Sequence, residues 1–476
     1  MKKTKIVSTL GPASSSFEEL VKMIDAGLNV VRLNFSHGSA DEKRILVDTV
    51  RKAAESLNKS VAILGDLQGP KIRVARFKEG KITLNAGDPF ILDADLPRED
   101  GDHKQVGIDY KDLPKDVKTG DVLLLNDGFI ILVVEKVEGN KIFCRTKVGG
   151  VLSNHKGINR QGGGLSAGAL TDKDREDLKT AVNLGVDYIA ISFVRSVEDV
   201  IETKRLVKEA GGTSKIISKI ERIEAIEPEN LKQIIEAGDG IMVARGDLAV
   251  EIGDEAVPAA QKLMIEYARN VGKPVIVATQ MLETMIHNVV PTRAEVSDVA
   301  NAVLDGTDAV MLSAESATGD HPALVVNTMA KICENAEKLL NNSGSVSYYP
   351  TLDCKKKAGR VLSELAVNLA NYTNAKLIGV LTNDGTVPLW VSRKNTHLPI
   401  VALTDNKQIY NQMLLYRNVT PVMFSYQGSC PGLKVAIIEK FKELGMVELG
   451  DQVLLLEEKE VSDPFETDAL LVLKVQ

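Results

Sequence analysis

The chain has 476 residues, of which 44% are hydrophobic and 26% are charged. This composition excludes a disordered chain. At roughly 100–200 residues per domain, the length predicts two to four folded domains and excludes a single small binding module. The 58 Lys and Arg residues against 65 Asp and Glu residues give a formal charge of −7. That balance excludes a general basic surface for nucleic acid, so a phosphorylated ligand would be held by a few local cations.

The four cysteines are far apart and form no C-x-x-C pair, which argues against a zinc site and against a disulfide framework. The apolar run before Gly11 is too short for a signal peptide. No stretch approaches about 18 uncharged apolar residues, the length of a membrane span. We therefore expect a soluble, cytoplasmic protein with no membrane partner.

Short strand-like runs alternate with helical runs in the first part of the chain. This βαβαβ order is typical of a parallel sheet with right-handed crossovers. After Gly69 the pattern changes to short alternating segments between Gly and Asp turns, which predicts a β-rich insertion that folds as a small barrel. The predicted strands before it are residues 5–9, 30–34 and 61–66, with helices over 17–26 and 41–57.

Strand and helix runs resume after residue 166 and predict five further strands. With the first three they make eight βα units, the number that closes a (β/α)8 TIM barrel. A polar, Gly- and Ser-containing linker then precedes alternating strands and helices that are typical of a three-layer α/β domain. The five strands are predicted at 188–193, 215–221, 240–245, 274–280 and 308–313. The expected division is a barrel domain (1–68 and 167–343), an inserted lid domain (69–166) and a C-terminal regulatory-type α/β domain (344–476).

In such a barrel the chemistry lies at the C-terminal ends of the strands. Those ends are unusually polar in this sequence, and charged groups at most ends of one ring are hard to explain as packing or as helix caps. The residues there are Arg32, Asn34, Ser36, His37, Asp66, Lys219, Glu221, Arg245, Gly246, Asp247, Thr279, Gln280, Ser313 and Glu315.

Two of these carboxylates, Glu221 and Asp247, are hard oxygen ligands that suit Mg2+ or Mn2+, and no His or Cys cluster offers a softer site. Either one alone is also explained as a salt-bridge partner. Lys219 lies two residues before Glu221 on the same face of its strand, so the group fits a metal-plus-cation site for an anion better than a structural ion pair. Arg32 and Arg73 add guanidinium groups suited to phosphoryl oxygens.

Two further basic residues have alternative interpretations. Lys156 lies in the Gly-rich stretch where the insertion ends. It belongs either to a lid that carries the lysine onto a bound phosphate or to a flexible linker with incidental charge. His37 is explained as well by packing or a helix entry as by a ligand contact.

Five segments of the sequence resemble those of the pyruvate kinase family. They are RLNFSHG at 32–38, GDLQGPKIR at 65–73, SKIE at 218–221, MVARGDL at 242–248 and the long segment 278–316. The resemblance is close over the barrel and the insertion, and it holds only in layout over the C-terminal part. It implies Mg2+-dependent phosphoryl transfer from phosphoenolpyruvate to ADP, giving pyruvate and ATP in the last step of glycolysis, by a homotetramer.

The resemblance also implies roles for the site residues. Glu221 and Asp247 would bind the substrate-side Mg2+, and a second Mg2+ would arrive with the nucleotide. Lys219 would stabilise the transferring phosphoryl group and the enolate oxygen, and Arg32 would clamp the phosphoryl group. The other assignments are Asn34, His37, Arg73 and Lys156 for the nucleotide, Gly246, Asp247 and Thr279 for the substrate, and Thr279 with Ser313 near the water that protonates the enolate.

One departure from the family pattern concerns the monovalent cation that many pyruvate kinases need. The groups that hold it correspond to Asn34, Ser36, Asp66 and the backbone of Leu67, and such members typically have glutamate at the position of Lys71. A lysine ammonium is a compact cation that can lie near Asp66 and supply the charge that K+ would bring. We therefore expect activity without K+.

A second departure lies in the C-terminal part. Members that are activated by sugar phosphates bind the effector through a Ser- and Thr-rich loop and a Gly-rich segment near the C-terminus. Here the loop is residues 382–386, TNDGT, and the tail carries carboxylates that would repel a phosphate. These carboxylates are Glu457, Glu458, Glu460, Asp463, Glu466 and Asp468. We expect no activation by fructose 1,6-bisphosphate. Whether a different small phosphorylated effector binds there is left open by the sequence.

Two other functions remain as alternatives. A Mg2+-dependent lyase that acts on pyruvate-like enolates also uses such a barrel with a carboxylate pair, but it would not need an insertion with Arg73 and Lys156. A catalytically silent regulatory protein would keep the fold without the chemistry, although every charged catalytic position is present.

Overall fold

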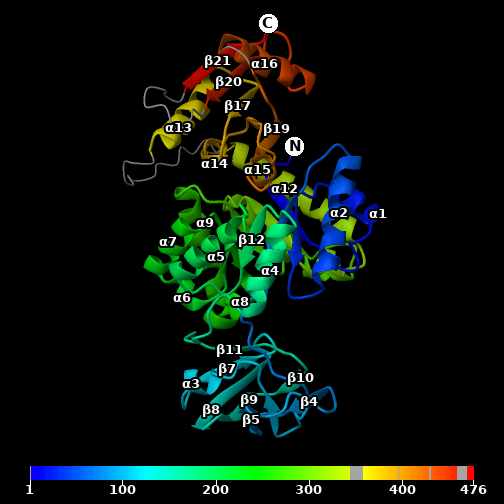
Figure 1. The fold of residues 1–476 in the computed structure, drawn as a ribbon, viewed down its shortest axis with the longest axis vertical. Coiled ribbons are helices and arrows are strands. Elements are labelled where there is room, and N and C mark those ends of the chain that lie inside the picture. The colour runs from blue at the N-terminus through cyan, green and yellow to red at the C-terminus, as the bar shows by residue number, and fades with distance from the viewer. Residues whose placement is uncertain (1, 343–356, 395, 428–429, 458–468) are drawn as a thin grey trace.

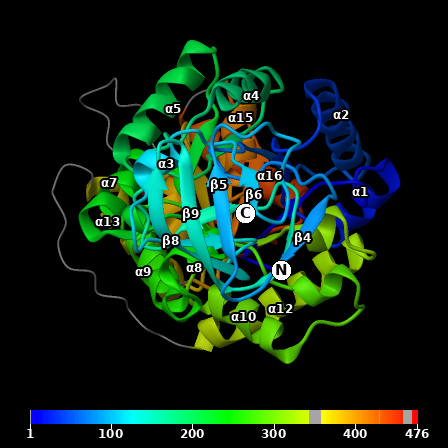
Figure 2. The same cartoon turned by 90° about the horizontal axis from the view of Figure 1, so that it is seen from below.

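The computed structural model describes residues 2–342, 357–394, 396–427, 430–457 and 469–476. Its parts follow one another along the long axis of the molecule, with a closed barrel in the middle (Figure 1). The insertion, residues 69–166, lies at one end of the barrel, and the C-terminal part lies at the other. Seen from below, the sheet of the insertion lies in front of the ring of barrel helices (Figure 2). Different parts of the chain therefore cover the two ends of the barrel.

The barrel is a closed ring of eight parallel strands in the order β1-β2-β3-β12-β13-β14-β15-β16, and β16 pairs back onto β1. This ring confirms the predicted (β/α)8 barrel. The strands are β1 (Lys5–Thr9), β2 (Val30–Asn34), β3 (Ala62–Asp66), β12 (Tyr188–Ile191), β13 (Lys215–Ile220), β14 (Gly240–Ala244), β15 (Val275–Ala278) and β16 (Ala309–Leu312). The larger helices around them are α1 (Phe17–Asp25), α2 (Ala40–Ser56), α4 (Asp172–Asn183), α5 (Val197–Glu209), α7 (Pro228–Ala237), α9 (Val257–Asn270), α10 (Arg293–Leu304) and α12 (Pro322–Asn342).

Local sequence signals start several of these helices. The Ser39 hydroxyl accepts the N–H of Glu42, and the Glu42 carboxylate accepts the N–H of Ser39, so α2 begins with a capping box. At α1 only half of such a box is present: the Ser16 hydroxyl accepts the N–H of Glu19. The Glu19 carboxylate instead accepts the N–H of Ala323 at the start of α12. Glu19 therefore joins the first and last barrel helices.

Two barrel strands end two residues earlier than the sequence predicts. β12 stops at Ile191 and β15 stops at Ala278, although strands were expected through residues 193 and 280. Phe193, Thr279 and Gln280 have φ angles of +56°, +67° and +54°, in the left-handed region that an extended strand does not contain. Each strand therefore turns sharply at its C-terminal end.

Four polar side chains join neighbouring strands at the N-terminal ends of the barrel. They lie at every second seam, where a seam is the boundary between two paired strands. Each lies directly before one strand and accepts a backbone N–H from the start of the neighbouring strand. The donor is the second residue of that strand in three cases and the first residue, Val275 of β15, in the fourth. These four pins are Asn29 to Ile6 (3.0 Å), Asp187 to Ile63 (2.8 Å), Asp239 to Ile216 (2.9 Å) and Asp308 to Val275 (3.0 Å). They join β1 to β2, β3 to β12, β13 to β14 and β15 to β16, which are alternate seams of the ring.

The insertion is rich in strands, as expected, and its strands pack around one apolar core. They form a six-stranded sheet in the order β11-β7-β8-β9-β5-β6 and a two-stranded sheet of β4 and β10, where a small barrel was expected. Isolated bridges such as Arg73 to Gly157 add to these sheets. The elements are β4 (Lys81–Leu84), β5 (Pro89–Asp93), β6 (Gln105–Gly107), α3 (Leu113–Asp116), β7 (Val122–Leu125), β8 (Ile130–Glu138), β9 (Lys141–Val148), β10 (Gly150–Ser153) and β11 (Ile158–Arg160).

The C-terminal part has a five-stranded sheet in the order β19-β18-β17-β20-β21, in which only β21 is antiparallel to its neighbour. Helices pack on it, as the alternating sequence pattern predicts. Its elements are α13 (Lys357–Tyr372), β17 (Leu377–Leu381), α14 (Thr386–Ser392), β18 (Ile400–Thr404), α15 (Lys407–Met413), β19 (Val419–Met423), α16 (Cys430–Glu443), β20 (Gln452–Glu457) and β21 (Ala469–Lys474).

Buried polar contacts fasten the C-terminal part to the barrel. Asp308, fully buried, pairs with the guanidinium of Arg393 and accepts the N–H of Arg417 at 3.0 Å. Burial would raise the pKa of Asp308, but Arg393 holds it below its usual value. Tyr188 of β12 donates its hydroxyl to the Gln412 carbonyl. Side chains inside the barrel and in the C-terminal core therefore form one continuous apolar cluster.

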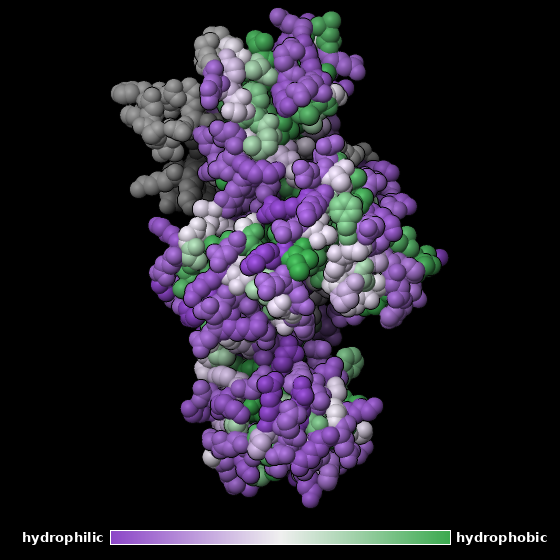
Figure 3. All heavy atoms as spheres, turned by 45° about the vertical axis from the view of Figure 1, so that its right-hand side comes forward, coloured by the Kyte–Doolittle hydropathy of each residue, from purple (hydrophilic) through white to green (hydrophobic). Residues whose placement is uncertain are grey.

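The outer surface is mostly hydrophilic on the face seen in Figure 3, including the narrow junction between barrel and insertion. Among the residues that the structure describes, we find no helix with the length and apolar character that crossing a bilayer requires.

The pin at Asp187 is the basis of a stability prediction. Burial raises the pKa of this carboxyl to about 6, although the Ile63 N–H and the Asn411 side chain bond to it and Arg51 and Lys407 lie nearby. Because the folded-state pKa lies above the ordinary value of 3.8, the ionised carboxylate weakens the fold above about pH 6. That loss is recovered as the pH falls from about 6 toward 4.

Asp187→Asn should therefore raise the free energy of unfolding at pH 7.5 by up to about 3 kcal/mol, because the amide oxygen still accepts the Ile63 N–H. The gain should shrink toward pH 5. Urea unfolding of the variant and the parent at both pH values measures it. Asp239→Asn is the matched control, because it breaks the 2.8 Å ion pair with Lys204 and should lower stability. A gain for Asp187→Asn that is equal at both pH values would contradict the prediction.

Candidate active site

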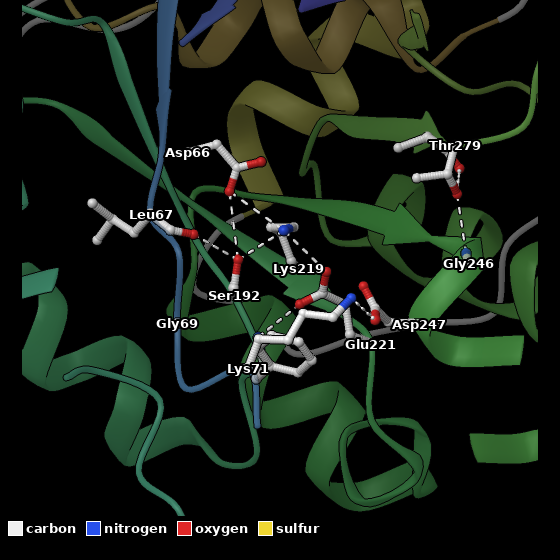
Figure 4. Close-up of polar contacts among 12 residues, drawn as sticks. Asp66, Leu67, Gly69, Lys71, Ser192, Lys219, Glu221, Gly246, Asp247 and Thr279 are labelled. Atoms are coloured by element: carbon white, nitrogen blue, oxygen red, sulfur yellow. Dashed lines mark hydrogen bonds and ion pairs between the residues drawn. The ribbon is translucent and has the colours of Figure 1, made fainter. Parts of the chain in front are cut away.

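A buried carboxylate, Asp66 at the end of β3, lies at the centre of the predicted site (Figure 4). Its side chain is 1% exposed, and its two oxygens pair with Arg32 Nε at 2.6 Å and Lys219 Nζ at 3.4 Å. Burial would raise the pKa of Asp66, but these two cations hold it below its usual value. Three of the predicted residues, from three different strands, are therefore in direct contact.

Lys219 connects Asp66 to the predicted metal ligand Glu221. Its Nζ lies 3.0 Å from Glu221 Oε1 and donates to Ser192 Oγ at 2.7 Å. Burial lowers the pKa of Lys219, but Asp66 and Glu221 outweigh this and raise it, so the ammonium stays charged. The other Glu221 oxygen accepts the N–H of Phe193 at 2.8 Å. Figure 4 shows Lys219 between the two carboxylates.

Asp247, the second predicted metal ligand, lies directly after β14 in the short helix α8 (Arg245–Ile252). Its Oδ1 pairs with Lys71 Nζ at 2.9 Å. Lys71, which was expected near Asp66, therefore forms its ion pair with Asp247. Both Asp66 oxygens are buried and already paired, whereas the Asp247 side chain is 23% exposed and accessible to a lysine from the insertion side.

The C-terminal ends of the strands, with the residues that follow them, form the rim of the barrel. A further contact at this rim joins the ends of β14 and β15. Gly246 N donates to Thr279 Oγ1 at 3.0 Å, and Thr279 Oγ1 donates to the Ala278 carbonyl at 2.7 Å. Arg245 beside them is engaged elsewhere, because its guanidinium pairs with Asp298 at 2.7 Å and donates to the Thr279 carbonyl. We call the connected side chains of Arg32, Asp66, Ser192, Lys219 and Glu221 the Asp66 cluster. In the described part of the chain Arg245 supports the rim and makes no hydrogen bond or ion pair with this cluster.

The rim residues after β16 are tied to one another. Glu315, which is 2% exposed, lies in α11 (Ala314–Ala317) and accepts the N–H groups of Ser313 at 2.7 Å and Leu282 at 3.3 Å. Within the described part of the chain, Ser313 makes no contact with the Asp66 cluster that we can identify. The prediction that Ser313 acts beside Thr279 therefore rests only on the position of both residues at the rim.

The predicted nucleotide residues Asn34 and His37 line a hollow of about 630 Å3 between the ends of β1 and β2 and helix α2. Thr9 also lines this hollow and accepts Arg32 Nη1 at 2.9 Å, which connects the hollow to the Asp66 cluster. The Asn34 side-chain oxygen accepts the N–H of Ser36 at 3.0 Å, so these two members of the expected monovalent-cation pocket are bonded to each other.

The other two nucleotide residues, Arg73 and Lys156, lie together on the insertion. The Arg73 guanidinium donates to the His155 carbonyl at 3.0 Å, and the Lys156 carbonyl accepts the N–H of Val74 at 2.9 Å. No contact of either side chain with the barrel residues above is present in the described parts of the chain. The two residues therefore share one place on the insertion, as the sequence indicates.

The two carboxylates fit a divalent cation as part of a larger ligand set. In the described ranges no group of three or more His, Cys, Asp or Glu side chains is arranged to hold a metal. Burial raises the pKa of Glu221, and repulsion by Asp247 adds to this, an effect that a divalent cation bound by both would reverse. Mg2+ is usually bound by one or two carboxylates, with water and substrate oxygens completing its shell. Glu221 and Asp247 match that arrangement.

Sequence reasoning overlooked two residues of the rim. Ser192, directly after β12, bonds to Lys219, and Thr9, the last residue of β1, bonds to Arg32. Thr9 ends a predicted strand, so the rule that selected the other candidates would have found it. Ser192 fell inside the strand predicted at 188–193, and its place at a strand end became visible only when β12 was seen to stop at Ile191.

The fold is a (β/α)8 barrel with a cluster of charged side chains at the C-terminal ends of its strands, which is where enzymes of this fold carry their active sites. Residues 1–326 match the barrel domain of pyruvate kinase, and residues 360–473 match its alpha/beta domain. The chain is 47% identical to pyruvate kinase II of Salmonella typhimurium, over 100% of this chain and 99% of that protein. It is 48% identical to a pyruvate kinase of Haemophilus influenzae (96% and 95% covered) and 41% identical to one of Thermotoga maritima (96% of each). The chain belongs to the pyruvate kinase family and is a phosphotransferase.

Backbone strain at Thr279 gives a prediction for the rim. Its φ of +67° lies in a region that β-branched residues rarely adopt, at a cost on the order of 1 kcal/mol or more. Thr279→Gly removes the strain, and Thr279→Ala keeps most of it, while both lose the bond to Gly246. The glycine variant should therefore be more stable than the alanine variant by about 1 kcal/mol. Urea unfolding of the two variants measures this difference, and a more stable alanine variant would contradict it.

Proposed function

We propose that this pyruvate kinase transfers the phosphoryl group of phosphoenolpyruvate to ADP at the Asp66 cluster. The observation that carries this proposal is Lys219, whose side chain is 12% exposed and is held between Asp66 and Glu221, with Arg32 on the other side of Asp66. Two fixed cations in a buried site stabilise negative charge far better than they would in water. Phosphoryl transfer needs mainly such positioning and charge stabilisation.

Each residue has a proposed role in this reaction. Arg32 binds the transferring phosphoryl group with the donors of its planar guanidinium. Lys219 stabilises that group and the enolate oxygen that develops as the phosphoryl leaves. The Gly246 N–H and the Thr279 hydroxyl orient the carboxylate or methyl end of the substrate. Water near Thr279 and Ser313 then delivers the proton to the enolate carbon.

We assign Glu221 and Asp247 as the protein ligands of Mg2+, with Mn2+ as an alternative. When bound, the metal polarises phosphoryl oxygens and offsets their charge. Asp247 would exchange its ion pair with Lys71 for the metal, and the Lys71 ammonium would stay in the site as a free cation. A second Mg2+ is expected with the nucleotide.

The division of the chain into a barrel domain (1–68 and 167–343), a lid (69–166) and a C-terminal regulatory-type domain (344–476) belongs to the same proposal. Asn34 and His37 would contact the nucleotide from the barrel, and Arg73 with Lys156 would contact it from the lid. A lid that closes brings these cations to the phosphates and excludes water. The expected homotetramer remains a prediction.

One coupled assay tests the reaction. The full-length chain should form pyruvate from phosphoenolpyruvate only when ADP and Mg2+ are both present, and Glu221→Gln should lower kcat by about 100-fold or more. Lys219→Gln should lower kcat by about 1,000-fold, the upper end for loss of one stabilising group. Lys262→Gln, which changes an exposed ion pair on α9, is the control and should keep full activity. Pyruvate formation without ADP would instead favour the lyase alternative, and none at all would favour a silent regulatory protein.

We further propose that turnover does not require K+. The support is the Lys71 ammonium, which pairs with Asp247 within the rim. K+-requiring members typically carry glutamate at the position of Lys71. An internal ammonium can supply the positive charge that a bound K+ supplies elsewhere.

Replacing K+ by a tetramethylammonium salt should therefore leave kcat nearly unchanged. Lys71→Glu should lose most activity in that salt and regain part of it with K+, because the variant restores the residue typical of K+-requiring members. Lys71→Met removes the ammonium without adding a carboxylate, so comparing it with Lys71→Glu shows how much activity each change costs. A parent enzyme whose turnover collapses without K+ would rule out the proposal.

We also propose that fructose 1,6-bisphosphate does not activate this enzyme. The support lies in the loop after β17, where the Asp384 carboxylate accepts the Thr386 N–H at 2.7 Å and its hydroxyl at 2.8 Å. The Thr382 hydroxyl likewise accepts the N–H of Gly385 at 2.9 Å. Donors that a phosphate would need are thus bonded within the loop. Of the acidic tail residues, Glu457 is buried, and Glu458, Glu460, Asp463, Glu466 and Asp468 lie outside the described residues.

Titration with fructose 1,6-bisphosphate at subsaturating phosphoenolpyruvate should leave the half-saturation concentration unchanged. An equal ionic strength of sodium sulfate controls for salt effects. Ribose phosphates and nucleoside monophosphates, titrated in the same way, search for another effector. A large fall in half-saturation with fructose 1,6-bisphosphate would refute the proposal.

A further inference from the structure

Ser192 is the uncharged partner of the catalytic lysine. It follows β12 directly and is 2% exposed. Lys219 Nζ donates to Ser192 Oγ at 2.7 Å, and Ser192 Oγ donates to the Leu67 carbonyl at 2.8 Å. A hydroxyl carries one proton and two lone pairs. Because the Leu67 carbonyl at 2.8 Å is a closer acceptor than Asp66 Oδ1 at 3.5 Å, the hydroxyl proton goes to Leu67 and a lone pair accepts from the ammonium.

The chemistry of the other Lys219 partners makes Ser192 distinctive. Glu221 and Asp66 are carboxylates, so each partly neutralises the ammonium that it holds. Glu221 is also the proposed metal ligand, and a metal would compete with Lys219 for it. A neutral hydroxyl fixes the position of the ammonium and leaves its charge for the substrate. Ser192 is therefore the Lys219 partner that substrate and metal leave in place.

The second contact of Ser192 is with the connection that leaves the barrel for the insertion. Leu67 N donates to the Ala190 carbonyl at 3.0 Å, and Gly69 N donates to Asp174 Oδ1 at 3.0 Å. Gly69 has a φ of +67°, and a Cβ on it would lie 2.7 Å from the Ser192 Cβ. The connection is thus pressed against Ser192 and bonded on both sides of it (Figure 4).

We propose that Ser192 is a positioning residue that acts through Lys219. It holds the ammonium at the reacting phosphoryl group and fixes its place relative to Leu67, where the insertion begins. This inference rests on the role proposed for Lys219. It concerns the placement of the ammonium and not substrate binding, so its loss should lower kcat and leave the KM for phosphoenolpyruvate nearly unchanged.

The test is the coupled assay on Ser192→Ala in the full-length chain. Loss of a hydrogen bond to a charged group predicts a fall in kcat of about 10- to 100-fold. Ser218→Ala is the matched control, because Ser218 is also fully buried beside Lys219 and its hydroxyl has no hydrogen-bond partner in the described chain. That control should keep its kcat. Ser192→Cys keeps the shape with a weaker acceptor and should give an intermediate kcat, and it replaces the alanine variant if that variant does not fold.

A double-mutant cycle separates positioning from a structural role. Ser192→Ala combined with Lys219→Gln should be no slower than Lys219→Gln alone, because the hydroxyl has no ammonium left to position. An equal loss in both backgrounds, or a parent-like kcat for Ser192→Ala while Lys219→Gln is inactive, would overturn the inference and leave the proposed function intact. Full activity of Lys219→Gln would instead overturn the role of Lys219 and the inference with it.

Discussion

The burial of one carboxylate, Asp66, determines most of the active site. A buried ion without a partner costs several kcal/mol, so Asp66 requires the cations Arg32 and Lys219. Lys219 in turn pairs with Glu221, and Lys71 pairs with Asp247. These six side chains thus balance three carboxylates with three cations before any ligand binds. A divalent metal and an anionic substrate keep that balance when they enter together, whereas either one alone disturbs it.

The same cluster determines how the insertion is attached. Its first connection lies against Ser192 and Asp174, and its return connection bonds to the barrel through Gly164, whose N–H donates to Glu224 Oε1 at 2.5 Å. The Leu165 carbonyl accepts donors from two arginines that follow barrel strands, Arg195 and the buried Arg222. Both connections therefore end on residues next to the Lys219 strand. A movement of the insertion and a change in the charge of the rim act on the same few residues.

Local signals in the sequence were enough to predict the eight strands, the β-rich insertion and the charged residues at the strand ends, because strand period and the strand-end rule depend on neighbouring residues. The partner of Lys71 could not be predicted this way. A four-carbon side chain reaches either of two carboxylates, and the choice depends on which one other cations already occupy in three dimensions. The early ends of β12 and β15 were missed because Phe193 and Thr279 give no sequence signal for left-handed backbone. Strand order in the insertion depends on distant pairings that no local pattern records.

The two ends of the barrel are joined at complementary seams. The pins at the N-terminal ends join β1 to β2, β3 to β12, β13 to β14 and β15 to β16. The other four seams are crossed at the C-terminal ends by Arg32 to Asp66, Lys219 to Ser192, Gly246 to Thr279, and Thr9 Oγ1 to the Leu312 carbonyl. Three of these four crossings use residues of the proposed catalytic site, so a bound ligand that recruits them acts on three of the four seams that have no pin. Backbone pairing closes every seam of the ring, and side-chain contacts reinforce four seams at the N-terminal end of the barrel and the other four at the C-terminal end, where the ligand binds.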